Sequence, residues 1–141
     1  MPVKVLFVCI GNSCRSQMAE TLARHMAADV VKPSSAGISP LGEISEPTCM
    51  VLEERGLHMD GQYSKKLRPG DRKAADLIIN MTGRPARQIF PAEAAKVEDW
   101  DVGDPYGEDL ETYRLICYEI EVRLSDLADR LRDKKRKPRR A

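Results

Sequence analysis

Residues 3–20 read VKVLFVCIGNSCRSQMAE, an apolar run followed by a short polar loop and the start of an amphipathic segment. The run from Val3 to Val8 is rich in β-branched residues and predicts a strand, and the apolar spacing after Ser16 predicts a helix. Gly11 allows the loop between them to turn tightly. Amides that leave a strand or open a helix have no partner within either element, so this loop is expected to present free N–H donors at one spot.

Cys9 and Arg15 stand at the two ends of this loop. The free amides, the helix N-terminus and the Arg15 guanidinium all favour a thiolate at Cys9 over the thiol, and a thiolate is a nucleophile. The planar fork of Arg15 suits two oxygens of a phosphoryl group, and Ser16 is placed to donate a hydrogen bond to the sulfur. A tetrahedral dianion is the expected guest. A buried Cys and a surface Arg in an ordinary turn are the alternative.

The loop from Cys9 to Ser16 resembles that of the low molecular weight protein tyrosine phosphatases, whose fold thioredoxin-coupled arsenate reductases share. Similar segments follow at 35–37, 64–67, 76–81 and 104–107. The resemblance implies an α/β domain over residues 1–131, with a four-stranded parallel sheet, helices on both faces and a phosphate-binding loop after the first strand. It implies that phosphate is bound by Ile10, Gly11, Asn12, Ser13, Cys14, Arg15 and Ser16.

Hydrolysis through a phosphocysteine needs a group that gives a proton to the leaving oxygen and then takes one from water. Asp104 is the candidate, because Pro105 biases it away from helix and toward a loop. The resemblance gives this Asp-Pro pair the same duty. The stretch Asp-Pro-Tyr-Gly is also simply a good turn. Asp109 is expected to begin the last helix, where a carboxylate suits the free amides.

Other segments predict the remaining elements. We expect strands at 30–35, 76–81 and 96–100 and helices at 45–56 and from Pro85, an alternation that indicates a parallel sheet. A stripe at steps of three and four predicts a long final helix on that sheet, with a coiled coil as the alternative. Cys117 on this stripe and Cys49 are expected to be structural. The stripe consists of Leu110, Tyr113, Cys117, Ile120, Leu124, Leu127 and Leu131.

Composition fits one soluble domain: the chain has 141 residues, 42% of them hydrophobic, and a net charge of +1. No apolar run approaches the roughly 18 residues of a membrane span, and no leader is evident, so we expect a cytoplasmic protein that contacts no membrane. The cysteines lack metal-ligand spacing, and we expect neither a metal nor another cofactor. Residues 132–141 carry seven basic and one acidic side chain. They are expected to form a disordered tail without a specific nucleic-acid partner.

Three further expectations concern the surroundings of the loop. The resemblance implies that Cys14 protects Cys9 through a reversible disulfide, although a small residue that merely fits the loop is the alternative. Leu41 and Tyr106 are expected to line the substrate pocket, and the lack of a bulky ring at 39–42 leaves the preference for phosphotyrosine open. Gln62 stands where the family has a supporting His, so Asn12 is expected to be held by a different partner.

The predicted function is hydrolysis of phosphomonoesters, with a phosphorylated protein, above all phosphotyrosine, or a small aryl phosphate as substrate. Arsenate reduction is an alternative, since arsenate mimics phosphate and the middle of the chain resembles the reductases. Thr82 and Phe90 lie where thioredoxin-coupled reductases carry relay thiols. A reductase would therefore use glutathione and glutaredoxin or another thiol donor. A phosphocarrier or inactive anion-binding module is the third reading, and we expect a monomer or weak dimer.

Overall fold

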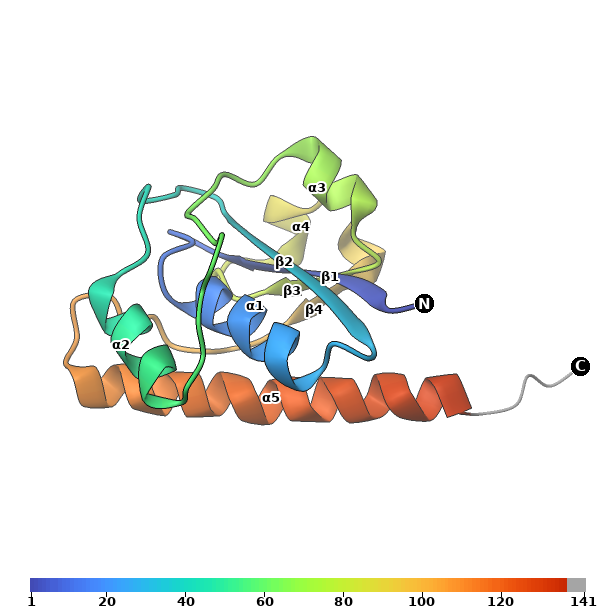
Figure 1. The fold of residues 1–141 in the computed structure, drawn as a ribbon. Coiled ribbons are helices and arrows are strands. Elements are labelled where there is room, and N and C mark those ends of the chain that lie inside the picture. The colour runs from blue at the N-terminus through green and yellow to red at the C-terminus, as the bar shows by residue number, and fades with distance from the viewer. Residues whose placement is uncertain (137–141) are drawn as a thin grey trace, which may run out of the picture.

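The computed structural model describes residues 1–136 and confirms the expected fold class: a four-stranded parallel sheet with helices on both faces (Figure 1). The strands lie in the order β2-β1-β3-β4, and each is within two residues of its predicted bounds. In chain order the elements are β1 (Val3–Cys9), α1 (Arg15–Met26), β2 (Val31–Gly37), α2 (Glu46–Glu54), α3 (Pro69–Ala74), β3 (Leu77–Asn80), α4 (Ala86–Ile89), a short 3-10 turn (Ala94–Lys96), β4 (Val97–Asp99) and α5 (Leu110–Arg136).

The central strand β1 is buried on both faces because it pairs with β2 on one side and β3 on the other. Its side chains alternate between two cores, as the period of a strand requires. Val5 and Phe7 belong to the core under α1, α2 and α5, whereas Leu6 and Val8 belong to the core under α3 and α4. This double burial explains why the β1 sequence is a continuous apolar run.

Helix α5 packs its apolar stripe on its own sheet, so the coiled-coil alternative is not needed. Figure 1 shows the helix running along the face of the sheet that α1 and α2 also cover. Cys117 is fully buried, as expected of a structural thiol. The other fully or nearly fully buried members of the stripe are Tyr113, Ile120, Leu124 and Leu127.

The starts of α2 and α5 follow the expected capping chemistry. Ser45 caps α2, because its hydroxyl accepts a hydrogen bond from the Thr48 amide at 3.4 Å. Asp109 does the same for α5, accepting from the Thr112 amide at 2.9 Å, which confirms that Asp109 begins the last helix. Helix α3 was not predicted. None of its residues is buried, so the sequence carries no apolar periodicity there.

The expected boundary of the basic tail needs correction. Helix α5 continues to Arg136, so residues 132–136 are helical rather than disordered. Arg132 stabilises this end of the helix. Its guanidinium donates hydrogen bonds to both carboxylate oxygens of Asp29 at 2.9 Å and to the Met26 carbonyl at 3.1 Å. Residues 137–141 of the expected tail lie outside the described residues.

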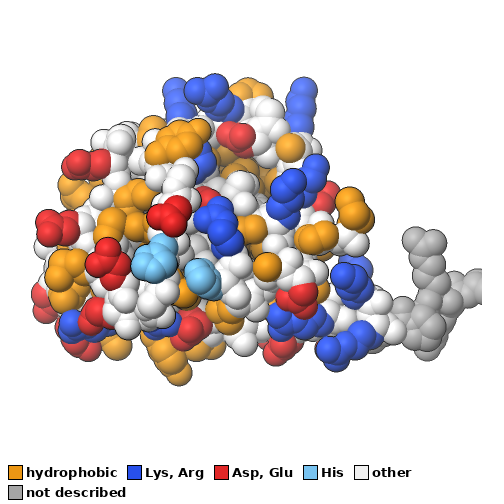
Figure 2. Space-filling model, in the orientation of Figure 1, with side chains coloured by type: hydrophobic (Ala, Val, Ile, Leu, Met, Phe, Trp, Pro, Cys, Tyr) orange, Lys and Arg blue, Asp and Glu red, His pale blue; other side chains and the backbone are white. Residues whose placement is uncertain are grey.

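Charges of both signs cover the surface drawn in Figure 2. Lys and Arg side chains gather along the upper edge, over α3, and near the described end of α5, while acidic side chains are more frequent toward α2. Within residues 1–136, no helix combines the length and the apolar character needed to cross a membrane.

Candidate active site

The loop between β1 and α1 turns its carbonyl groups outward. Every carbonyl from Cys9 to Cys14 accepts a hydrogen bond from a neighbouring segment or from α1. The donors, in loop order, are Ile38 N (3.2 Å), Ser39 N (2.8 Å), Leu41 N (3.1 Å) with Ser64 Oγ (3.1 Å), Gln17 Nε2 (3.1 Å), Ser45 N (3.1 Å) with Thr48 Oγ1 (3.2 Å), and Met18 N (2.9 Å).

The amides of the same loop are free. No backbone N–H from Ile10 to Ser16 donates to an acceptor within residues 1–136. A loop whose carbonyls all face outward directs its amides inward, and successive free amides at a helix N-terminus form an anion-binding concavity. The expected cradle is therefore present as a backbone structure.

Asn12 holds the loop in shape from below. Its backbone is in the left-handed region, with φ at 47°, and its side chain is fully buried. The carboxamide oxygen accepts from Gln17 Nε2 and from the Lys65 amide, both at 2.9 Å, while Nδ2 donates to Ser16 and Ser35. This confirms that Asn12 has partners other than Gln62.

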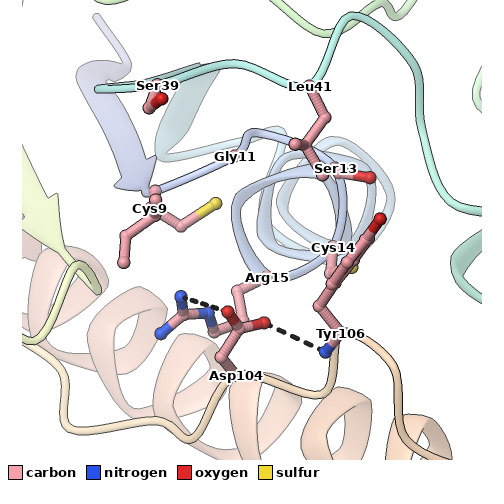
Figure 3. A pocket seen from close by; sticks show the side chains of 10 residues that line it. Cys9, Gly11, Ser13, Cys14, Arg15, Ser39, Leu41, Asp104 and Tyr106 are labelled. Atoms are coloured by element: carbon pink, nitrogen blue, oxygen red, sulfur yellow. Dashed lines mark hydrogen bonds and ion pairs between the residues drawn. The ribbon is translucent and has the colours of Figure 1, made fainter.

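Cys9 ends β1 with its sulfur directed over the loop (Figure 3). The sulfur lies 2.8 Å from the Ser16 hydroxyl, the contact that the sequence predicts. The Ser16 hydroxyl is the side-chain group within residues 1–136 that contacts the sulfur.

Arg15 is buried beside the loop and held by backbone. Its NH1 group donates to the carbonyls of Met81 at 2.6 Å and Val102 at 3.0 Å. Among residues 1–136, no acceptor takes a hydrogen bond from Nε or NH2, and NH2 lies 3.6 Å from the Asp104 carboxylate. The guanidinium is thus anchored through one edge and presents its other edge, a two-donor fork, to the pocket.

Asp104 lies on the loop after β4, at the pocket mouth (Figure 3). One carboxylate oxygen accepts from the Tyr106 amide at 3.0 Å, and the other faces Arg15. Its side chain is about half exposed, at 49%. The segment 104–107 therefore forms a turn and also holds the Asp104 carboxylate next to the free loop amides. The interpretation as a turn and the interpretation as a site for the acid are compatible.

These groups surround a pocket of about 210 Å³. Leu41 and Tyr106 are its exposed apolar members, at 51% and 59% exposure, and form the mouth. Asn12 and Ser16 do not line the pocket but support it from below, and Ser39 lines it in addition to Leu41 from the same segment 39–42. The full lining is Cys9, Ile10, Gly11, Ser13, Cys14, Arg15, Ser39, Leu41, Asp104 and Tyr106.

Cys14 turns its sulfur toward α2 and α5. The sulfur lies 3.3 Å from the Ser45 hydroxyl and 3.7 Å from the Tyr113 hydroxyl, and both Cys9 and Cys14 are free thiols. Burial and the hydrogen bond with Cys14 raise the pKa of Tyr113 to about 12, so this phenol stays protonated. A bond between the two sulfurs would require Cys14 to leave these partners.

The chain is similar to known proteins over nearly its whole length. A family model described as low molecular weight phosphotyrosine protein phosphatase matches residues 4–137. A glutaredoxin arsenate reductase of Synechocystis sp. is 32% identical over 127 residues, covering 88% of this chain and 95% of the relative.

Two solved structures have the same fold over similar lengths. The YwlE arginine phosphatase from Geobacillus stearothermophilus aligns with a TM-score of 0.87 at 29% identity, covering 99% of this chain and 100% of the other. A low molecular weight protein tyrosine phosphatase from T. tengcongensis aligns with a TM-score of 0.81 at 33% identity, covering 92% and 99%. Similar proteins therefore carry the names of three different activities.

Proposed function

Because the chain belongs to the low molecular weight phosphotyrosine protein phosphatase family, we propose that it hydrolyses phosphomonoesters through a phosphocysteine, acting on protein phosphotyrosine and small aryl phosphates. The observation that carries this proposal is the ring of free amides from Ile10 to Ser16, with the Cys9 sulfur at one end and the open fork of Arg15 at the other. Such a ring matches the three outer oxygens of a phosphoryl group.

In the first step, the Cys9 thiolate attacks phosphorus, a sulfur–phosphorus bond forms and the bond to the leaving oxygen breaks. Asp104, in its protonated form, gives its proton to that oxygen. The loop amides and Arg15 hold the three outer oxygens while negative charge spreads over them.

In the second step, water attacks the phosphocysteine and gives a proton to the Asp104 carboxylate, which restores the acid for the next turnover. The sulfur–phosphorus bond breaks, and inorganic phosphate and the Cys9 thiolate are released. The cycle needs no metal or other cofactor. It does need a compartment that keeps thiols reduced, which supports a cytoplasmic location.

The apolar mouth of the pocket favours a substrate with an aromatic leaving group. Leu41 and Tyr106 present apolar surface on the way from solvent to Cys9, where a phenyl ring attached to a bound phosphate would lie. Contact of a ring with Tyr106 would add aromatic packing to area burial.

Arsenate reduction is the second candidate, favoured by the similarity to the glutaredoxin arsenate reductase. Arsenate fits a cradle built for phosphate, and its reduction to arsenite requires two electrons from two thiols. Positions 82 and 90 hold a threonine, which donates a hydrogen bond to Asn80 at 2.7 Å, and a fully buried phenylalanine, and neither residue has a thiol. The electrons would come from Cys9 and an external donor such as glutathione.

One panel of assays on the full-length protein separates these functions. Wild type and Cys9→Ser are compared on an aryl phosphate, a phosphotyrosine peptide and a phosphoarginine peptide, and on arsenate with glutathione and glutaredoxin. Cys49→Ser is the matched control, since Cys49 lies outside the pocket.

We expect phosphotyrosine hydrolysis that Cys9→Ser abolishes and Cys49→Ser leaves intact. Faster hydrolysis of the phosphoarginine peptide than of the phosphotyrosine peptide would make phosphoarginine the substrate. Arsenite formation without hydrolysis of any phosphate ester would make arsenate the substrate. A labelled phosphoenzyme that accumulates without release of phosphate would identify a carrier instead.

A further inference from the structure

A buried carboxylate lies under the active-site loop, and no step above uses it. Glu20 is on α1, one turn beyond Ser16, and is only 5% exposed. Its oxygens accept from the Ser35 hydroxyl at 2.5 Å and from Arg24 at 2.6 Å, and Lys65 Nζ lies 3.8 Å away. A buried charge is costly unless it is paired and hydrogen-bonded, so this group calls for a physical explanation.

The carboxylate determines the direction of the Ser35 hydroxyl. An ionised Glu20 can only accept, so the single Ser35 proton points to Glu20 and the Ser35 oxygen is left to accept. It accepts from Asn12 Nδ2 at 3.0 Å and from Lys65 Nζ at 3.4 Å. Ser35 therefore connects Glu20 to the residue that supports the loop.

The Asn12 carboxamide is oriented from both of its ends. Its oxygen accepts from Gln17 and from the Lys65 amide. Its Nδ2 group donates to Ser16 and to the oxygen of Ser35, whose own proton is directed to Glu20. The Ser16 oxygen, which accepts one of the Nδ2 hydrogens at 2.8 Å, has a single proton of its own to donate. That proton points to the Cys9 sulfur, 2.8 Å away.

We propose that Glu20 is a positioning residue for the nucleophile: through Ser35 and Asn12 it fixes the direction of the Ser16 hydrogen bond to Cys9 and so favours the thiolate. The inference rests on the proposed function, because Cys9 is taken as the nucleophile. Glu20 touches neither the sulfur nor the pocket.

Two basic side chains face the Glu20 carboxylate. Arg24 faces Glu20 from the next turn of α1, and Lys65 faces it from the segment before α3. Burial lowers the pKa of Lys65, while the charges of Glu20 and Asp71 act in the opposite direction. Lys65 has a double part, since its backbone amide also bonds Asn12.

The test follows the reactivity of Cys9 without any substrate. The rate of Cys9 alkylation by iodoacetamide is measured against pH in wild type, Glu20→Gln and Ser35→Ala, with thermal unfolding to verify the fold. Glu119→Gln is the matched control, because Glu119 also faces an Arg four residues later, Arg123 at 3.7 Å, but on the exposed face of α5.

We expect the midpoint of this profile to rise by about half to one pH unit in Glu20→Gln and Ser35→Ala, a threefold to tenfold loss of thiolate at low pH. The sign is decisive. Removing a negative charge that acted only through space would favour the thiolate and lower the midpoint. An unchanged or lowered midpoint in both folded variants overturns the proposal, as does an equal rise in Glu119→Gln.

A double-mutant cycle separates positioning from a general structural role. Ser16→Ala removes the hydroxyl that donates to the Cys9 sulfur. In that background, Glu20→Gln should therefore produce no further rise in the midpoint of the alkylation profile. Additive shifts would show that Glu20 acts by another route and would contradict the proposal.

On an aryl phosphate we expect kcat to fall threefold to tenfold in Glu20→Gln while phosphate affinity stays unchanged. Loss of phosphate affinity with an unshifted alkylation profile would mean that Glu20 only maintains the loop, against the proposal. The proposed function fails separately, through hydrolysis that survives Cys9→Ser.

Discussion

Gly37 ends β2 directly against the active-site loop. A Cβ at this position would lie 2.7 Å from the Ile10 carbonyl oxygen and 2.9 Å from the Asn12 amide nitrogen. Both atoms belong to the backbone, so they cannot swing aside as a flexible side chain would. Glycine is needed at position 37 because two backbone segments approach each other closely there.

Gly37→Ala is expected to displace the loop and reduce kcat/KM on an aryl phosphate by about a hundredfold, since a displacement of about 1 Å has that effect on catalytic geometry. Phosphate should then raise the melting temperature less than in wild type. Gly70→Ala is the control, because a Cβ there meets nothing within 4 Å. Wild-type phosphate binding in Gly37→Ala would disprove the role of this contact.

Asp104→Asn removes the proposed acid and keeps the shape of the side chain. We expect kcat to fall by about 10²- to 10⁴-fold, with the larger loss for leaving groups of high pKa. Phosphate affinity should be kept, because Arg15 and the loop amides remain. Asp101→Asn is a nearby control outside the pocket. Unchanged turnover in Asp104→Asn would remove Asp104 from the mechanism.

Cys14 is expected to make oxidation of Cys9 reversible. Hydrogen peroxide should inactivate the wild type and a dithiol should restore it, since a disulfide is reducible whereas higher oxides of Cys9 are not. In Cys14→Ala, recovery after the same treatment should be lost. Activity measured before and after reduction decides this, and equal recovery in both proteins would exclude the role.

At the residue scale, the sequence predicts the groups that lie within the loop and misses the supporting groups on other segments. Cys9, Arg15 and Ser16 lie within eight residues in a recognisable pattern, and in the structure they lie around one loop. Glu20 and Ser35 lie 15 positions apart and meet because β2 pairs with β1 beside α1. The spacing of residues along the sequence does not reveal a contact that depends on the pairing of strands.

At the scale of the element, prediction succeeds where burial leaves a pattern in the sequence. Burial of one side gives α5 its apolar stripe, and burial of both faces gives β1 and β3 their continuous apolar runs. Helix α3 and the last turns of α5 carry no such pattern. Those turns are held by an ion pair between Arg132 and Asp29, which are 103 positions apart.

This ion pair predicts a pH-dependent contribution to stability. The hydrogen bond from Arg132 lowers the pKa of Asp29 from 3.8 to about 2. Because the folded pKa is the lower one, the contribution is complete above pH 4 and is lost as the pH falls toward 2. The melting temperature of Asp29→Asn should therefore lie below that of wild type at pH 5 and approach it at pH 2.

Arg132→Ala should reproduce the behaviour of Asp29→Asn, and Asp133→Asn is the control, since Asp133 makes no ion pair within residues 1–136. A difference between wild type and Asp29→Asn that stays constant from pH 5 to pH 2 would show that the Asp29 charge is not stabilised by folding.

At the scale of the whole molecule, the parallel sheet gathers the site from distant segments. The loop after β1 supplies Cys9 and Arg15, whereas the segments after β3 and β4 supply the two carbonyls that anchor Arg15. All three loops leave the carboxyl edge of the sheet, where such folds bind ligands. The resemblance predicted the parallel sheet and the loop after its first strand, but the anchoring of Arg15 by Met81 and Val102 depends on backbone positions that no side-chain pattern reveals.

The fold gives the four cysteines different surroundings, and we expect their thiols to differ in reactivity. Burial raises the pKa of Cys117 to about 11 and also raises the pKa of Cys49, so neither is a ready nucleophile near neutral pH. The Cys14 sulfur contacts the hydroxyl groups of Ser45 and Tyr113. Only Cys9 combines a free cradle, a hydroxyl donor and an opening to solvent through the pocket, so it should react first with iodoacetamide at pH 7.

Alkylation followed by mass spectrometry of peptides measures all four thiols in one experiment. Cys9 should be modified at least about tenfold faster than Cys49, the most accessible of the others. Vanadate or sulfate should slow Cys9 alone, because the anion occupies the amides and Arg15 that face its sulfur. Faster labelling of Cys49, or labelling of Cys9 that anions do not slow, would mean that the cradle does not act on the sulfur.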